Sequence, residues 1–256
     1  MRFETDFASA DYLTSHISRL KSVKMDWNSD ILKNLSWNAT ISNRESKQKV
    51  ADQIAAKVKD GDIIGVGSGS TSYLAILAIG EKIKAEKLNV LAIPTSIEIA
   101  LTCSKLGIPT TSLYEYKPDW YFDGADEVDP NKHLIKGRGG AMFKEKLIMT
   151  ASARNYIIVD DSKLVDKIGS KFPVPVEVFP SALMVAEAGL KKLGATEIVL
   201  RPATGKDGPI ISENGNLILD VRFEHIDVDM EFKIKCIAGV IESGLFQNQT
   251  AEILVA

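Results

Sequence analysis

The sequence predicts an α/β protein with a Rossmann-like parallel sheet and a second, smaller α+β domain of ferredoxin-like kind. Between residues 46 and 170, apolar runs of strand length alternate with amphipathic stretches of helical length, which is the pattern of βαβ units. Beyond about residue 173 the order changes to β-α-β-β-α, which is typical of a small α+β domain. With 256 residues, 45% of them apolar and 25% charged, the chain is long enough for one or two domains with a full core.

The first domain is expected to open with a helix from residue 46. Ser46 can cap it, and the apolar residues Val50, Ile54 and Val58 fall on one face. Further strands and helices follow in alternation, so we expect parallel strands covered on both faces. The expected strands lie at 62–67, 89–93, 111–116 and 155–159, with a short one running into Asp123, and the helices lie at 72–86 and 96–105.

The second domain is expected to consist of short elements separated by turn residues. In order, these are a strand at 174–178, a helix at 181–193, a strand at 197–201, a hairpin joining 210–211 to 217–221, and a helix at about 229–237. Asn214-Gly215 suits a type I′ turn in the hairpin. A last strand at 251–255 can return to the first domain.

These elements divide the chain into three parts. We expect an α/β catalytic domain formed by residues 46–170 and 242–256, and a small α+β domain at 171–241. Residues 1–45 differ from the rest and form an N-terminal extension of unknown role, in which a stretch such as 30–35 could make a short helix.

Charge, hydropathy and cysteine count exclude several classes of protein. The net charge is −3, so no basic excess favours binding to nucleic acid or to an anionic membrane. Because the sequence has neither a membrane-spanning apolar run nor a signal-peptide pattern, we expect a cytoplasmic protein. Cys103 and Cys236 are too few and too distant for a disulfide scaffold or a zinc knuckle, and the three histidines show no metal-ligand spacing. We therefore expect no metal.

A glycine-rich loop between the first expected strand and its following helix is typical of a phosphate site. Gly67 and Gly69 allow backbone amides to turn toward an anion, and the helix N-terminus adds its dipole. Ser68, Ser70 and Thr71 add hydroxyl groups. The loop lacks the lysine of a Walker motif, and Ser70 stands where G-x-G-x-x-G has its third glycine, which disfavours a nucleotide. Taken alone, the loop could also be a tight turn with a serine cap.

Two aspartates follow the strand that runs into Asp123. In Asp123-Gly124-Ala125-Asp126-Glu127, the carboxylates of Asp123 and Asp126 lie beyond the carboxyl end of a strand, where open α/β sheets bind ligands. They can accept hydrogen bonds from sugar hydroxyls. Helix capping or a solvated acidic loop is the alternative for this segment alone.

A second glycine-rich turn, Lys136-Gly137-Arg138-Gly139-Gly140, opens another expected helix. Glu145 lies near the second turn of that helix and could project back toward the loop. A lysine beside two aspartates and a glutamate suits proton transfer better than phosphate hydrolysis. Glu145 could instead be an exposed partner of a neighbouring lysine. Lys163, after the strand at 155–159, either adds positive charge to the same rim or is a surface lysine.

Together these segments resemble ribose-5-phosphate isomerase, type A. The resemblance covers about residues 46–256 and rests on the order and spacing of four motifs. They are Gly65-Val66-Gly67-Ser68-Gly69-Ser70-Thr71, Asp123-Gly124-Ala125-Asp126-Glu127, Lys136-Gly137-Arg138-Gly139-Gly140 with Glu145, and Asp161-Ser162-Lys163. Arg138 stands where many members have glycine, and Phe143 replaces a frequent threonine. The resemblance implies interconversion of D-ribose 5-phosphate and D-ribulose 5-phosphate through a cis-enediolate, with no cofactor.

The resemblance also implies catalytic roles for individual residues. Glu145 would take the C2 proton of the open-chain aldose and return it to C1. Lys136, with the hydroxyl of Ser68, would stabilise the charge that develops on the carbonyl oxygen. Asp123 and Asp126 would orient hydroxyls and shuttle the proton between O1 and O2.

The remaining implied residues bind the substrate. Lys47 and Lys163 would hold the phosphate together with residues 67–71. The turns around the catalytic residues supply the other binding positions, which are Gly124, Ala125, Gly137, Arg138 and Gly139. Members of the family are usually dimers or tetramers. We therefore expect a homodimer or homotetramer that binds a small-molecule sugar phosphate, and neither nucleic acid nor a membrane.

Two alternatives share parts of this pattern. A non-catalytic sugar-phosphate sensor, of which the effector domain of DeoR-type repressors is the related case, would use the same fold and loop. Glu145, Lys136 and both aspartates are all present, however, and residues 1–45 show no convincing helix-turn-helix. An acyl-coenzyme A transferase also uses a glutamate, as a nucleophile. The phosphate loop and the Asp-Gly-Ala-Asp-Glu motif favour the isomerase.

Overall fold

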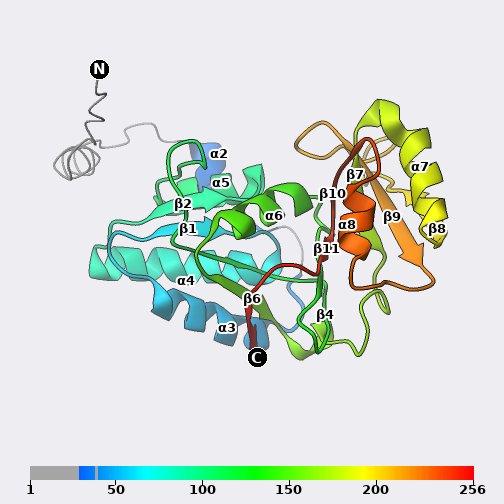
Figure 1. Ribbon diagram of the computed structural model, residues 1–256. Helices are drawn as coiled ribbons and strands as arrows, with labels where there is room; N and C mark the ends of the chain where they lie inside the picture. Colours follow the sequence, from blue (N-terminus) through cyan, green and yellow to red (C-terminus); the bar gives the residue numbers. More distant parts are fainter. Residues whose placement is uncertain (1–28, 38–39) are drawn as a thin grey trace, which may run out of the picture. The chain divides into compact units, whose positions relative to one another are not determined.

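The computed structural model describes residues 29–37 and 40–256 (Figure 1). The chain divides into two units, residues 1–36 and 37–256. In the described part of the first unit, helix α2 (Asp30–Lys33) begins after Ser29, whose hydroxyl accepts from the Leu32 amide. A short helix was expected in this stretch. Two parts of the predicted extension, residues 1–28 and 38–39, lie outside the described residues.

The second unit contains a five-stranded parallel sheet in the order β12-β6-β3-β1-β2. Its strands are β1 (Ile63–Val66), β2 (Leu91–Pro94), β3 (Trp120–Asp123), β6 (Asn155–Val159) and β12 (Glu252–Val255). The last strand therefore returns to the first sheet, as predicted. Because β2 and β3 lie on opposite sides of β1, the strand order reverses there. Open α/β sheets bind ligands at such a switch point, beyond the carboxyl ends of the strands.

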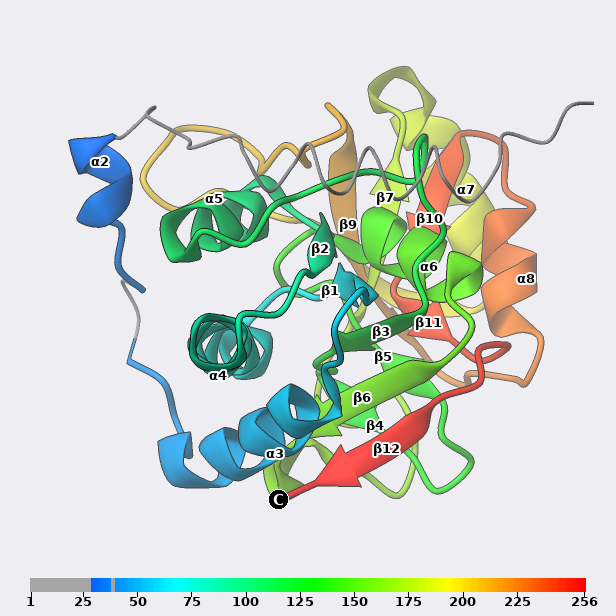
Figure 2. The ribbon, with the colours of Figure 1, turned by 90° about the vertical axis from the view of Figure 1, so that its left-hand side faces the viewer.

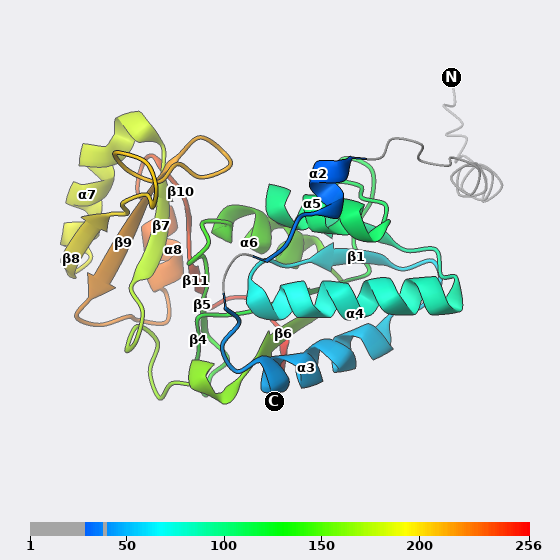
Figure 3. The same cartoon turned by 180° about the vertical axis from the view of Figure 1, so that it is seen from behind.

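Helices cover both faces of this sheet (Figures 2 and 3). On one face, α3 (Arg44–Lys57), α4 (Ser70–Glu86) and α5 (Ile97–Leu106) pack on inward-facing strand residues such as Ile64 and Phe122. On the other face, α6 (Met142–Ala151) packs on Tyr121 and Ile157. The apolar strands are buried on both faces, as parallel strands usually are. No helix in the described part of the chain has the length and apolar character needed to cross a bilayer.

A three-stranded antiparallel sheet, in the order β11-β5-β4, was not predicted from the sequence. Its strands are β4 (Glu127–Val128), β5 (Leu134–Ile135) and β11 (Leu245–Phe246). Strands of two residues are too short to show an alternating pattern. The sheet nevertheless positions functional residues, because β4 follows Asp126 and β5 ends immediately before Lys136. A 3₁₀ helix, η1 (Asp161–Lys163), follows β6.

The third sheet is antiparallel and has the order β10-β7-β9-β8. Its strands are β7 (Val174–Val178), β8 (Ala195–Leu200), β9 (Leu217–Phe223) and β10 (Val240–Ser243). Helices α7 (Leu183–Lys192) and α8 (Met230–Lys235) pack on one face, and a 3₁₀ turn, η2 (Pro180–Ala182), precedes α7. This β-α-β-β-α-β order confirms the predicted fold class, a Rossmann-like sheet with a ferredoxin-like α+β part. The exact domain boundaries stay a prediction.

The predicted strand at 111–116 is wrong. Thr110, immediately before this segment, pairs with Ala92 through an isolated parallel bridge, and residues 111–116 form no strand. The carbonyl of Ser112 accepts from the amides of Glu115 and Tyr116, so the chain turns instead of extending. Local turn hydrogen bonds outweigh the strand propensity of this threonine- and tyrosine-containing segment.

Two predicted local signals are also corrected. Helix α3 begins at Arg44 after Asn43, so Ser46 lies inside its first turn and does not cap it. The hairpin turn is not type I′, because only Gly215 has a positive φ (79°) and Asn214 does not. Instead the amide of Ser212 donates to the Asn216 carbonyl across a three-residue loop. The buried Glu177 carboxylate accepts from the side chains of Ser212, Asn214 and Asn216, which explains this loop conformation.

Candidate active site

A cavity of about 480 Å³ lies at the switch point beyond β1 and β3. Its walls come from the loops after these two strands, the turn after β5 and the first turn of α6, with side chains from α3 and η1. Every predicted site residue except Gly67 lines it. Three further lining residues, Trp37, Thr40 and Ser42, come from the predicted N-terminal extension.

Gly67 does not line the cavity but leaves room for the Asp123 side chain. A Cβ atom at this position would lie 2.2 Å from Cγ of Asp123, so any side chain would displace the aspartate. The Gly67 amide donates to the Phe122 carbonyl at 2.8 Å and extends the pairing of β1 with β3. The glycine therefore admits the Asp123 side chain between two loops, and it was predicted instead to contact substrate.

The carboxylate of Asp123 is fully buried and saturated with donors. Its Oδ1 accepts from the Gly124 amide at 2.7 Å and from Ser72 Oγ at 3.2 Å. Its Oδ2 accepts from the Tyr121 hydroxyl and lies 2.8 Å from Lys136 Nζ. Burial, and then the Asp123 charge, raise the pKa of Tyr121 well above its ordinary value, so this hydroxyl remains a donor. Asp123 is thus placed to hold Lys136, with little capacity left for a substrate proton.

Lys136 lies between two carboxylates at the base of the cavity. The side chain is 3% exposed, and Nζ lies 2.8 Å from Asp123 Oδ2 and 3.3 Å from Glu145 Oε2. It also donates to the Gly124 carbonyl. Burial alone would lower the pKa of Lys136, but the charges of Asp123 and Glu145 raise it above its ordinary value. The ammonium group therefore stays charged where it faces the cavity.

Glu145 is a buried carboxylate with an oxygen that lacks a hydrogen bond. The residue is 5% exposed, and Oε2 has no hydrogen-bond partner among the described residues, despite lying 3.3 Å from Lys136 Nζ. Burial raises the pKa of Glu145 to about 8; Lys136 opposes this rise, and Asp123 and Asp126 add to it. Desolvation, the largest cause of the raised pKa, makes this carboxylate able to accept a proton at near-neutral pH.

Asp126 is the aspartate that remains open to the cavity. It is partly exposed, and its Oδ2 accepts from the Arg138 amide at 3.1 Å. Burial raises the pKa of Asp126, against the lowering effect of Lys136. Asp126 therefore suits a role in exchanging protons with substrate hydroxyls.

No cluster of three or more His, Cys, Asp or Glu side chains that could hold a metal ion occurs in the parts of the chain that the structure describes.

The part of the cavity lined by the start of α4 has the features of an anion site. Gly69 precedes α4 with a φ of 89°, and no side chain caps the first amides of this helix. Lys47 Nζ lies 3.2 Å from Ser70 Oγ and 3.3 Å from Ser42 Oγ. Burial lowers the pKa of Lys47, although Asp160, 3.8 Å away, opposes the change. A bound anion would favour the charged form of this lysine.

The hydroxyl of Ser68 is engaged within the protein. Its Oγ lies 2.7 Å from Thr95 Oγ1 and 3.2 Å from Ser96 Oγ. Because Thr95 can donate to the Val66 carbonyl, the single Ser68 hydrogen points to Thr95 or Ser96. Ser68 then offers a ligand a lone pair, and the predicted stabilisation of an oxyanion would require this hydroxyl to rotate away from both partners.

Several residues around the site were missed in the sequence. Tyr121 precedes Asp123 by two positions on the same strand, so strand alternation could have placed both on one face. Trp37 carried no such signal. Its ring packs against Tyr73 of α4, with centroids 4.9 Å apart, and Trp37, Thr40 and Ser42 line the cavity. Part of the predicted extension thus belongs to the site.

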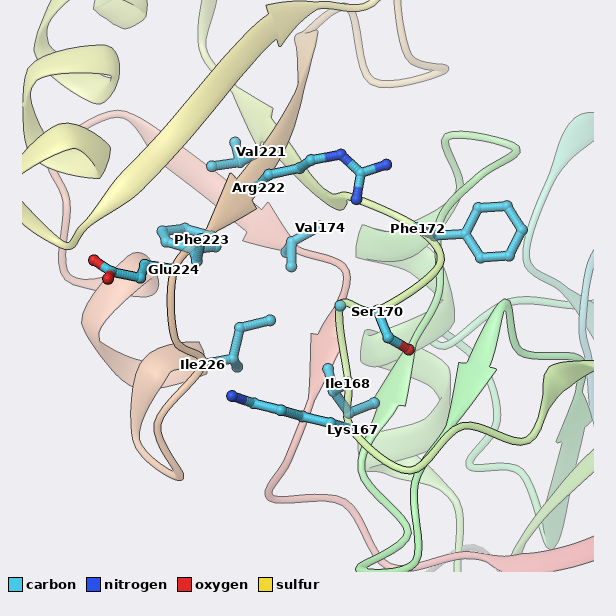
Figure 4. Close-up of a pocket in the computed structure, with 11 residues that line it drawn as sticks. Lys167, Ile168, Ser170, Phe172, Val174, Val221, Arg222, Phe223, Glu224 and Ile226 are labelled. Atoms are coloured by element: carbon cyan, nitrogen blue, oxygen red, sulfur yellow. The ribbon is translucent and has the colours of Figure 1, made fainter.

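A second, smaller cavity of about 120 Å³ contains none of the predicted site residues (Figure 4). Side chains from β7, from β9 and from the segment before β7 line it, with Lys167, Arg222 and Glu224 supplying charges. It contains no buried unpartnered polar group among the described residues. We assign it no chemistry.

Sequence comparison finds one family. A family model described as ribose 5-phosphate isomerase A (phosphoriboisomerase A) matches residues 91–256. The ribose-5-phosphate isomerase A of Thermosynechococcus vestitus is 44% identical over 216 residues, which are 83% of this chain and 91% of the relative. That of Methanocaldococcus jannaschii is 45% identical over 209 residues, which are 80% and 92% of the two chains.

Solved structures agree with the sequence comparison. Ribose 5-phosphate isomerase A from M. jannaschii superposes with a TM-score of 0.81 at 43% identity, covering 84% of this chain and 95% of that one. A D-ribose-5-phosphate isomerase in complex with phospho-erythronic acid superposes with a TM-score of 0.80 at 40% identity, covering 83% and 94%.

Proposed function

The chain belongs to the ribose 5-phosphate isomerase A family, and we propose that it interconverts D-ribose 5-phosphate and D-ribulose 5-phosphate in the cavity at the β1/β3 switch point. One observation carries the proposal. The buried Glu145 carboxylate lies 3.3 Å from the Lys136 ammonium, in the same cavity as the anion site at the start of α4. The activity named for the relatives favours catalysis over the sensing alternative.

The two ends of the cavity suit the two ends of a sugar phosphate. We assign the phosphate to the amides at the start of α4, with Lys47, Ser70 and Lys163 around it. The reacting carbons C1 and C2 then lie toward Glu145 and Lys136. Holding the substrate at both ends fixes the C2 proton against the base. The proposed partner is this small molecule, and the proposed assembly is a cytoplasmic homodimer or homotetramer.

The chemistry is a proton transfer between adjacent carbons. The Glu145 carboxylate takes the C2 proton of the open-chain aldose, the C1–C2 double bond forms, and the electron pair of the C1 carbonyl moves to O1. The Lys136 ammonium, held by Asp123, stabilises the resulting cis-enediolate. Asp126 exchanges the proton between O2 and O1. Glu145 then delivers its proton to C1, which leaves a carbonyl at C2.

The raised pKa of Glu145 predicts the pH dependence of the reaction. Because the base must be ionised, kcat/KM for ribose 5-phosphate is expected to rise with pH and to level off above about pH 8. The profile should be measured from about pH 6.5, above the second ionisation of the substrate phosphate near pH 6. A flat profile from there to about pH 10 would contradict the assignment of this carboxyl as the base.

Conversion of ribose 5-phosphate by the EDTA-treated wild-type protein tests the proposed function itself. We expect ribulose 5-phosphate to form without added metal. If a folded protein binds ribose 5-phosphate but does not convert it, the function is sensing and not catalysis.

A further inference from the structure

The side chain of Arg201, which lies beside the antiparallel sheet of β8 and β9, binds the Lys136–Gly140 turn. It follows β8, and its Nη1 donates to the carbonyls of Gly137 at 3.1 Å and Arg138 at 2.9 Å. The other side of the guanidinium pairs with both carboxylate oxygens of Asp220 on β9, at 2.8 and 2.5 Å. The side chain of Arg201 is only 13% exposed. One largely buried cation therefore connects two consecutive peptide carbonyls of the turn to the β10-β7-β9-β8 sheet.

This contact fixes the direction of two amide groups. In a trans peptide the carbonyl and the N–H point in opposite directions. Because the Gly137 carbonyl faces Arg201, the Arg138 amide faces away from it, and there it donates to Asp126 Oδ2 at 3.1 Å. By the same geometry the amide of Gly139 points away from Arg201. It has no hydrogen-bond partner in the described parts of the chain, and Gly139 lines the cavity.

The turn needs such a constraint. Gly137 and Gly140 have φ angles of 93° and 85°, and Gly139 lies between them. The Gly140 amide donates to the Gly137 carbonyl at 2.9 Å and closes the turn, but among the described residues no backbone hydrogen bond to the Arg138 carbonyl fixes the peptide between Arg138 and Gly139. Arg201 supplies two hydrogen bonds to the turn while Asp220 fixes the guanidinium plane. A lysine at this position could not make both contacts and the paired bonds to Asp220 together.

We propose that Arg201 is a positioning residue for this active site. It aims the Arg138 amide at Asp126, which orients that carboxylate, and it aims the Gly139 amide into the cavity as a donor for an oxygen on the reacting carbons. The inference rests on the proposed function, because it assigns the Gly139 donor to the C1–C2 end of the sugar phosphate. It adds a residue that directly follows β8, about 60 residues from the turn in the sequence.

Two ligands distinguish positioning from a merely structural role. The proposed function assigns inorganic phosphate to the anion site, which Arg201 does not touch. Phospho-erythronic acid carries a phosphate and, at its other end, a carboxylate, which the proposal places at the turn. In the full chain, Arg201→Gln is expected to lower the affinity for phospho-erythronic acid about tenfold, which corresponds to the loss of roughly one well-oriented hydrogen bond. The affinity for inorganic phosphate should stay unchanged. Arg201→Lys is expected to behave in the same way.

Arg222→Gln is the matched control. Arg222 lies on β9 in the same sheet and makes a longer contact of 3.6 Å with Glu197, at side chains that are 43% and 59% exposed. It does not touch the turn, so this variant should bind both ligands as the wild type does. Calorimetry gives both affinities, and steady-state kinetics should show a lower kcat/KM for Arg201→Gln alone.

Two outcomes would overturn the inference. The first is unchanged binding of phospho-erythronic acid by Arg201→Gln, and the second is an equal loss for both ligands, which indicates general damage to the fold. The binding contrast does not depend on turnover. If the wild type fails to convert ribose 5-phosphate, the proposed function fails, but the two affinities still decide whether Arg201 positions the turn.

Discussion

Replacing Glu145 with glutamine is expected to lower kcat at least about 100-fold, the usual contribution of a general base, and to leave KM for ribose 5-phosphate nearly unchanged. Glutamine keeps the size of the side chain, so the cavity should keep its shape. It cannot accept the C2 proton. Steady-state kinetics of the wild type and the variant at about pH 8, where half of the Glu145 carboxyl is ionised, measure the difference.

A suitable control for this variant is Glu98→Gln. Burial also raises the pKa of Glu98, but this residue lies on α5 and does not line the cavity. Its replacement should leave kcat within about twofold of the wild type, because surface and peripheral substitutions usually have small effects. Near-normal turnover of Glu145→Gln would remove Glu145 from its role.

Loss of activity in Glu145→Gln should not come with loss of stability. The folded-state pKa of Glu145, about 8, lies above the ordinary value of 4.5. The protonated carboxyl therefore stabilises the fold below the ordinary value, and this stability is lost as the pH rises through about 8. Glutamine resembles the protonated form, so thermal unfolding at about pH 9 should occur at or above the wild-type temperature.

Replacing Lys136 with methionine is expected to lower kcat by about 100-fold or more, because it removes the charge nearest the developing oxyanion. It should also raise the pKa of the base, since the Lys136 charge opposes the effect of burial on Glu145. The rising limb of the pH–rate profile should move above about pH 8 in this variant. Residual kcat/KM measured across the same pH range as for the wild type gives both quantities.

Lys136→Met should also unfold more easily, because removing one partner of a buried ion pair costs about 3–5 kcal/mol. Lys136→Arg keeps the positive charge beside Asp123 and Glu145, so it separates catalysis from stability. It should recover much of the lost stability, measured by denaturant unfolding. It should recover little of the activity, because the larger guanidinium displaces the side chains around it at the base of the cavity. If the rising limb of the pH–rate profile stays near pH 8 in a folded Lys136→Met protein, Lys136 does not lower the pKa of Glu145.

Local patterns in the sequence were enough to predict most of the cavity. Ser70 and Thr71 follow a glycine turn at the start of a helix, and Asp123 and Asp126 follow a strand, so each group carries its own signal. The parallel order of the strands then brings the two groups to one edge. Glu145 needed the resemblance as well, because its distance from Lys136 in the sequence does not alone show that the two side chains meet.

The contacts that prepare these groups could not be predicted, because they join residues far apart in the chain. Arg201 meets the carbonyls of the Lys136–Gly140 turn only after two different sheets have folded. Trp37 reaches the cavity through its contact with Tyr73. The prediction of a strand at 111–116 failed for a local reason instead. The turn at Ser112 forms through hydrogen bonds between neighbouring residues, which strand propensity does not describe.

The central claim is that Glu145 carries a proton between C2 and C1 of ribose 5-phosphate. Conversion of unlabelled ribose 5-phosphate in deuterated water, followed by NMR of the product, tests it most directly. The wild type is predicted to place solvent deuterium at C1 of ribulose 5-phosphate, because the proton on Glu145 can exchange before it is returned, and Glu145→Gln is predicted to place almost none. Incorporation of deuterium per turnover by Glu145→Gln equal to that by the wild type would contradict the claim.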